Sequence, residues 1–171
     1  MKLKAIIVDL DGCLVNSHQR FKRLNLKAYE NQDKEAFVNS IKHYNNDCRG
    51  DKVIDLGLDL FDWLVTYYKP DHIFFLTARG SGGYNPTIQW LKDENIWSDN
   101  CTLIMQQENL GDFQFSTQSH HAEYKKQEAM KIMEKYDVLY AVDDDEQNCQ
   151  AFAELKIPTI HLMLPLGRMI L

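Results

Sequence analysis

The chain lacks any apolar run of membrane-spanning length, and its first residues lack the pattern of a secretory signal. A spanning helix needs about 20 consecutive apolar residues. The run that follows residues 1–4 is too short, and it stops on acidic residues rather than on a cleavage site. We therefore expect no membrane partner and a cytoplasmic location.

Cysteine pairs with metal-binding spacing are also missing. None of the four cysteines forms a Cys-x-x-Cys motif. Without a secretory signal, this usage favours reduced, buried thiols over disulfides or zinc ligands. The four are Cys13, Cys48, Cys101 and Cys149.

Basic residues are not in excess. The chain has 19 Lys and Arg against 25 Asp and Glu, for a net charge of -6. This balance argues against broad binding to duplexes, but a nucleotide or a nucleic-acid end can still be held locally by a few cations. The 171 residues are 44% hydrophobic and 26% charged, which is ordinary for a globular protein and predicts a single domain over 1–171.

Short apolar runs alternate with amphipathic helical patterns along the chain. This alternation predicts an α/β fold with a mainly parallel central sheet flanked by helices. Apolar helix positions such as Trp63, Trp90, Met130 and Met133 are expected in the core. The expected strands are roughly 3–9, 72–77, 101–106, 138–143 and 157–163, and the helical patterns lie at 56–67, 86–92, 122–136 and 146–155.

The segment at about 17–50 differs from the rest, because it is polar and rich in Asn, Lys and Gln. Helical patterns around 19–30 and 33–44 predict a small helical insertion. It follows the first strand directly, so we expect it to act as a cap over the edge of the sheet. The alternative is a surface decoration without a role.

Two acidic stretches each follow an apolar run. The first contains Asp9 and Asp11, and the second contains Asp143 and Asp144. Ligands bind at the carboxyl ends of the strands of parallel sheets. Carboxylates delivered there by two strands predict a site for a hard divalent cation, and the expected ion is Mg²⁺. Either stretch alone is also compatible with a simple turn, since Asp and Gly favour turns.

The residue types around these stretches suit phosphate chemistry. A carboxylate such as Asp9 can attack phosphorus, and a neighbouring acid such as Asp11 can protonate the leaving alkoxide. Thr77 ends another apolar run, and Arg79 and Gly80 follow it with groups that suit a phosphate. No phosphate-binding loop of the Gly-x-x-x-x-Gly-Lys-Ser/Thr type occurs.

A lysine pair opens the expected helix at about 125–136. Lys125 or Lys126 can reach the acidic site and offset its charge, although such a pair usually faces solvent. The adjacent His120 and His121 point different ways and are not expected to bind zinc.

In chain order, these elements are a strand ending Asp-x-Asp-Gly, a strand ending in Thr, a lysine that opens a helix, and a strand ending Asp-Asp. Over nearly the full chain they resemble the haloacid dehalogenase (HAD) superfamily of phosphotransferases. The match is close in Val8-Asp9-Leu10-Asp11-Gly12-Cys13-Leu14, where Cys13 replaces the commoner Thr. The resemblance implies a Rossmann-like sheet with helices on both sides.

The resemblance also implies a role for each residue. Asp9 is the expected nucleophile and Asp11 the expected general acid and base. Thr77 holds the transferring phosphoryl group, and Lys125 supports it. Mg²⁺ is expected on Asp9, on the backbone carbonyl of Asp11 and on Asp144, with Asp143 as a supporting neighbour.

A narrower likeness is to the 3′-phosphatase domain of bacteriophage polynucleotide kinase. In this likeness Arg20 corresponds to an arginine that follows the first motif of that domain, and Arg79 matches its arginine next to the second motif. The 21–50 segment is longer than expected, and His121 stands where an acidic residue is expected four positions before the lysine.

We therefore expect a Mg²⁺-dependent phosphatase that acts on a nucleotide or on the 3′-phosphate end of a nucleic acid. Arg20, Arg79 and Gly80 are the expected substrate-binding residues. A small-molecule nucleotidase is the close alternative, and a non-catalytic phosphate- or protein-binding module is the alternative from another class. The sequence leaves the oligomeric state open.

Overall fold

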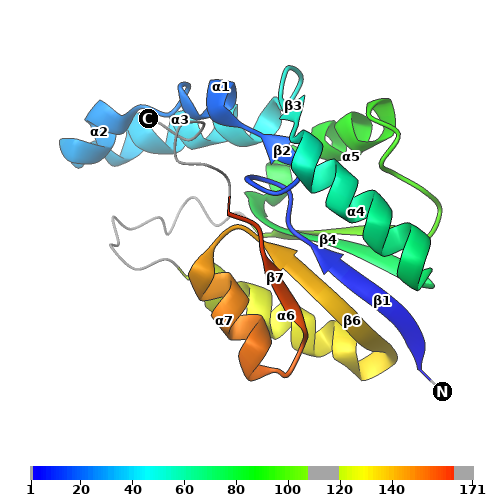
Figure 1. Ribbon diagram of the computed structural model, residues 1–171. Coiled ribbons are helices and arrows are strands. Elements are labelled where there is room, and N and C mark those ends of the chain that lie inside the picture. The colour runs from blue at the N-terminus through cyan, green and yellow to red at the C-terminus, as the bar shows by residue number, and fades with distance from the viewer. Residues whose placement is uncertain (1, 108–119, 164–171) are drawn as a thin grey trace.

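The chain forms a five-stranded parallel sheet with helices on both faces (Figure 1). A computed structural model describes residues 2–107 and 120–163. The predicted α/β class and mainly parallel sheet are confirmed. In the order β5-β4-β1-β6-β7, the strands are Cys101–Gln106, His72–Gly80, Leu3–Val8, Tyr136–Asp143 and Thr159–His161.

Alternate residues of each central strand face two separate apolar cores. Ile6 and Val8 of β1 pack in the core under α4 and α5, whereas Ala5 and Ile7 pack in the core under α6 and α7. A strand that is buried on both faces reads as a continuous apolar run, which explains the pattern in the sequence. The four helices are α4 (Asp55–Tyr68), α5 (Tyr84–Asp93), α6 (His121–Lys135) and α7 (Glu146–Glu154).

The insertion at 17–50 lies beyond the carboxyl ends of β1 and β6 (Figure 1). A short antiparallel ribbon joins its two ends, with Asn16 paired to Lys52. The helical pattern at 19–30 forms two short helices, because the side chain of Asn25 caps a new helix by accepting the N–H of Ala28 at 3.0 Å. The elements are β2 (Val15–Asn16), α1 (His18–Phe21), α2 (Leu26–Glu30), α3 (Lys34–Asn46) and β3 (Lys52–Val53).

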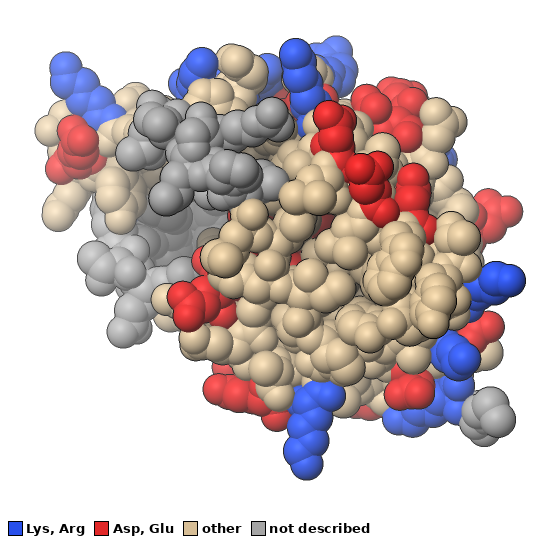
Figure 2. Space-filling model, viewed as in Figure 1, with Lys and Arg blue, Asp and Glu red and all other residues tan. Residues whose placement is uncertain are grey.

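The insertion is basic although the chain is acidic. Its residues 17–50 include seven Lys and Arg against four Asp and Glu. Figure 2 shows blue side chains along the edge where α1–α3 lie in Figure 1. The exposed cations of the insertion are Lys22, Arg23, Lys27, Lys34, Lys42 and Arg49.

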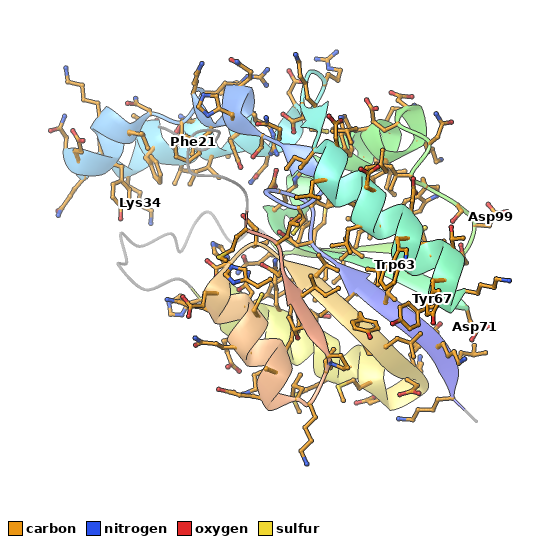
Figure 3. All side chains as sticks on the ribbon, viewed as in Figure 1. Phe21, Lys34, Trp63, Tyr67, Asp71 and Asp99 are labelled. Carbon is orange, nitrogen blue, oxygen red and sulfur yellow. The ribbon has the colours of Figure 1, made fainter. Side chains whose placement is uncertain are left out.

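Two of the expected core residues are in fact exposed. Trp63 is 50% exposed and Met130 is 53% exposed, whereas Trp90 is 5% exposed, as expected. Trp63 and Tyr67 both extend from α4 (Figure 3), and their rings stack with centroids 5.5 Å apart. The inner face of α4 is filled by Phe61 and Leu64 instead.

The helices described here offer no candidate for a membrane span, since none combines the length and the apolar content that crossing a bilayer requires.

Candidate active site

The turn after β1 positions the first acidic pair. The N–H of Asp9 donates to the carbonyl of Val142 at 2.9 Å, which extends the pairing of β1 with β6 by one residue. The carbonyl of Leu10 then accepts three backbone N–H groups from the next few residues, and this closes a tight turn. The turn sends the side chains of Asp9 and Asp11 to the carboxyl edge of the sheet.

Gly12 makes room for the second acidic stretch. Its φ of 83° is left-handed, and a Cβ there would lie 1.9 Å from Oδ2 of Asp144. Only glycine adopts this conformation readily and also leaves the space free. The loop after β1 and the loop after β6 therefore meet at this glycine, as the two acidic stretches predicted.

Lys125 lies between the carboxylates of the two stretches. Its Nζ is 2.8 Å from Asp9 and 2.7 Å from Asp143, and the lysine side chain is only 2% exposed. Asp143 also accepts hydrogen bonds from the side chain of Asn148 at 2.9 Å and from the N–H of Asp145 at 3.0 Å. Lys126 faces away and pairs with Glu154 at the surface. Of the two lysines, Lys125 is the one at the site.

The group formed by Asp9, Asp143, Asp144 and Lys125 carries uncompensated negative charge. When all three carboxylates are ionised they face one ammonium, which leaves an excess of two negative charges. Burial, together with Asp143 and Asp144, raises the pKa of Asp9 to about 8 despite the opposing effect of Lys125. Burial and Asp143 raise the pKa of Asp144 to about 6. A divalent cation would supply the missing charge.

The donor atoms around this group fit such a cation. One side-chain atom each from Asp9, Cys13 and Asp144 lie within 4.8 Å of one another. Asp143, by contrast, is occupied by Lys125, Asn148 and the backbone. The residues that would hold Mg²⁺ are therefore Asp9 and Asp144, with the Asp11 carbonyl as the expected further ligand.

Asp11 belongs to a second, separate network. Arg79 donates to its two oxygens at 2.6 and 2.8 Å, and Arg20 donates to Oδ1 at 2.6 Å. Burial alone would raise the pKa of Asp11, but the two arginines outweigh it and lower the pKa to about 2. This network balances its own charge, because Asp51 supplies the second carboxylate for the two guanidinium groups.

The expected substrate-binding arginines are thus held by carboxylates. Arg20 is 1% exposed and Arg79 is 4% exposed. Arg79 also donates to the hydroxyl of Thr87 at 3.0 Å. Both guanidinium groups are connected to the site by their hydrogen bonds to Asp11, an arrangement that the motif spacing did not predict.

Thr77 and Gly80 lie on β4 beside these groups. Thr77 is 1% exposed, and its hydroxyl accepts the N–H of Arg79 at 3.2 Å. Gly80 is the last residue of β4 and is buried. The structure therefore brings Thr77 to the expected edge of the sheet.

Asp51 and Tyr44 also belong to the site, but no motif in the sequence marks either of them. Asp51 pairs with Arg20 at 2.9 Å, and its carbonyl accepts the indole N–H of Trp90 at 3.1 Å. Tyr44 places its ring 4.3 Å from the guanidinium carbon of Arg20, and its carbonyl accepts an N–H of the same guanidinium. Tyr44 therefore packs on the guanidinium of Arg20.

Comparison with known proteins identifies the fold. No protein-family model and no curated protein matches the chain. Among solved structures, a chain of the Pnkp1/Rnl/Hen1 RNA repair complex aligns with a TM-score of 0.63 at 21% identity, and the match covers 95% of this chain. It spans only 43% of that chain, less than half of its length.

Two further structures carry the family name. A haloacid dehalogenase-like hydrolase from Streptococcus pneumoniae aligns with a TM-score of 0.58 at 13% identity, covering 93% of this chain and 84% of that one. The HAD domain of the effector Lem4 from Legionella pneumophila aligns with a TM-score of 0.53 at 15% identity, covering 96% and 88%. The chain therefore has the HAD fold, and the resemblance seen in its motifs is confirmed at the level of the fold.

Proposed function

We propose that this protein is a Mg²⁺-dependent phosphatase that hydrolyses phosphate monoesters through an aspartyl-phosphate on Asp9. The observation that carries the proposal is the position of the Asp9 carboxylate. It lies buried at the end of β1, 2.8 Å from Nζ of Lys125, in a group with excess negative charge. A protein that only binds phosphate would gain nothing from a buried carboxylate that repels the anion.

The chemistry follows from the two separate networks. An Asp9 oxygen attacks phosphorus while the bond from phosphorus to the leaving alkoxide breaks, and Asp11 gives its proton to that alkoxide. Water then attacks the aspartyl-phosphate, Asp11 takes a proton from the water, and Asp9 is released. Thr77 and Lys125 hold the phosphoryl oxygens. Asp9, Asp144 and the Asp11 carbonyl would hold Mg²⁺, which would supply the positive charge that the group of carboxylates lacks.

Asp11 must be protonated for the first of these steps. In the free protein Arg20 and Arg79 hold it as a carboxylate, with a pKa of about 2. A substrate phosphate that draws either guanidinium towards itself weakens this hold and raises the pKa of Asp11. The two expected functions of the arginines, substrate binding and control of the acid, are then coupled.

For the substrate, we propose a nucleotide or the 3′-phosphate end of a nucleic acid. The basic insertion lies at the carboxyl edge of the sheet (Figure 1), where a polyanionic strand would approach the site. The aligned chain of the Pnkp1/Rnl/Hen1 complex belongs to an RNA repair assembly, which is compatible with such a substrate. We also propose a cytoplasmic location and a cap role for residues 17–50.

A substrate panel tests the proposal. It contains 3′- and 5′-phosphorylated mononucleotides and oligonucleotides, sugar phosphates and an aryl phosphate, each with Mg²⁺ and with EDTA. We expect the highest kcat/KM for 3′-phosphorylated oligonucleotides and no turnover in EDTA. A preference for mononucleotides would favour a nucleotidase. No turnover of any ester would leave the non-catalytic module as the better account.

A further inference from the structure

Cys13 places a thiol beside the two carboxylates that would hold Mg²⁺. Its Sγ lies within 4.8 Å of a carboxylate oxygen of both Asp9 and Asp144. The tight turn brings it there, since the N–H of Cys13 donates to the carbonyl of Leu10 at 3.2 Å. The residue is 1% exposed, so its sulfur is fixed in this position.

Cys13 differs in this respect from the other thiols of the described residues. Sγ of Cys149 donates to the Asp143 carbonyl at 3.6 Å, and Cys101 lies at the start of β5 against Ser98. Within residues 2–107 and 120–163, Asp9, Cys13 and Asp144 are the one group of three such side chains whose donor atoms converge closely enough for a metal.

A donor set of two oxygens and one sulfur distinguishes between metal ions. Mg²⁺ takes oxygen ligands and would leave the thiol as an uncoordinated neighbour. Zn²⁺, Cd²⁺ and Co²⁺ bind carboxylate and also thiolate, which adds a strong bond that Mg²⁺ cannot form.

We propose that the site binds thiophilic divalent cations through Sγ of Cys13 together with the carboxylates of Asp9 and Asp144, in competition with Mg²⁺. As the metal–sulfur bond forms, the thiol releases its proton to solvent. The consequence is a phosphatase that zinc-like ions inhibit reversibly. The claim that Mg²⁺ is the ion displaced rests on the proposed function. The ligand set of Cys13, Asp9 and Asp144 does not depend on that function.

Titration of the metal-free protein with Co²⁺ and with Cd²⁺ tests this ligand set without any assay of activity. Ligation of either ion by thiolate gives an ultraviolet charge-transfer band. We expect one equivalent of each ion to produce the band, and excess Mg²⁺ to remove it. Cys13→Ser should lose the band and bind Cd²⁺ roughly tenfold more weakly or worse, while its affinity for Mg²⁺ stays within a few-fold. Cys101→Ser, which removes a buried thiol elsewhere, should behave as wild type.

A wild-type protein without the band, a band that survives in Cys13→Ser, or a band that Mg²⁺ does not displace would each overturn the proposal. If Cys13→Ser does not fold, Asp144→Asn provides the second test and must weaken the band of Co²⁺. Turnover with Mg²⁺ is measured separately. Its absence would count against the phosphatase function and not against the ligand set.

Discussion

The guanidinium of Arg79 donates two hydrogen bonds to the carboxylate of Asp11, at 2.6 and 2.8 Å. Paired bonds of this kind fix both the position and the orientation of the carboxylate. Arg79 comes from the end of β4, whereas Asp11 follows β1, so the pair locks together two neighbouring strand ends. A substitution at Arg79 should therefore alter the position and orientation of the Asp11 carboxylate.

We predict that Arg79→Lys lowers kcat/KM by about 10²-fold or more, in the range expected when general acid–base catalysis is impaired. Lysine keeps the charge but cannot make the paired bonds that orient Asp11. Arg79→Ala should also lower stability, by about 3–5 kcal/mol, because it leaves buried carboxylates without their partner. Steady-state kinetics and thermal unfolding measure the two effects.

Lys126→Ala is the matched control for the loss of a cation near the site. Among the described residues, Lys126 forms its ion pair with Glu154 at the surface, so its removal should change activity less than about twofold. An inactive Lys126→Ala variant together with an active Lys125→Ala variant would show that the assignment of the lysine is wrong.

The stability of the metal-free protein should depend on pH. The folded protein raises the pKa of Asp9 to about 8 and that of Asp144 to about 6, mainly by burial. The folded state therefore binds these protons more tightly than the unfolded chain. Their contribution to stability is present below about pH 4 and is lost as pH rises towards about 8. In EDTA, we expect Tm to fall between pH 5 and 8 on the order of several degrees.

Mg²⁺ should reverse this loss, and its effect on Tm should be largest at the upper end of the range. The lowered pKa of Asp11 acts in the opposite direction, but only below about pH 4, so it does not disturb the measurement. In Asp9→Asn the slope of Tm with pH should become shallower. If the slope of Tm with pH is unchanged in that variant, Asp9 is not the group that causes the pH dependence.

Gly12→Ala should impair Mg²⁺ binding, because the new Cβ would overlap the Asp144 carboxylate at 1.9 Å. Gly50→Ala is the control for backbone strain. Gly50 also has a positive φ, 126°, but none of the described residues comes within 4 Å of its Cβ position. Each variant should lose about 1–2 kcal/mol from the strained φ. Isothermal titration with Mg²⁺ should show a weakened affinity for Gly12→Ala alone. Equal affinities would place Asp144 outside the metal site.

Arg20→Ala should slow the hydrolysis of an aryl phosphate and of an oligonucleotide to a similar extent. Arg20 acts on Asp11, which serves every substrate, and it packs on Tyr44 within the insertion. This differs from the view in which Arg20 selects nucleotides. The ratio of the two kcat/KM values is the measurement, and a selective loss of oligonucleotide turnover would restore the selective role.

The sequence predicted those parts of the molecule that depend on local patterns. Apolar runs that stop on Asp9 and Asp143 located two strand ends, and parallel strands necessarily bring such ends to one edge. The choice of Lys125 over Lys126 came from the family resemblance, and the helix that carries it begins at His121 rather than at Lys125. Packing on α4 was predicted less well, because Trp63 and Phe61 are both aromatic and only the rotation of the helix decides which of them is buried.

The arginine network could not be predicted from motifs. Asp51 lies 40 residues beyond Asp11 and follows the insertion, so its pairing with Arg20 depends on how the insertion folds back. The β2–β3 ribbon, which brings the two ends of the insertion together, consists of two residues on each side. Such short pairings leave no periodic signal in a sequence.

Direct trapping of the covalent intermediate tests the central claim, that Asp9 is the nucleophile. Borohydride added during turnover with Mg²⁺ reduces an aspartyl-phosphate to homoserine, which peptide mass spectrometry locates. We predict homoserine at position 9, with no labelling in EDTA or in Asp9→Asn. Phosphate release without reduction at position 9, or reduction at another carboxylate, would contradict this account of the site.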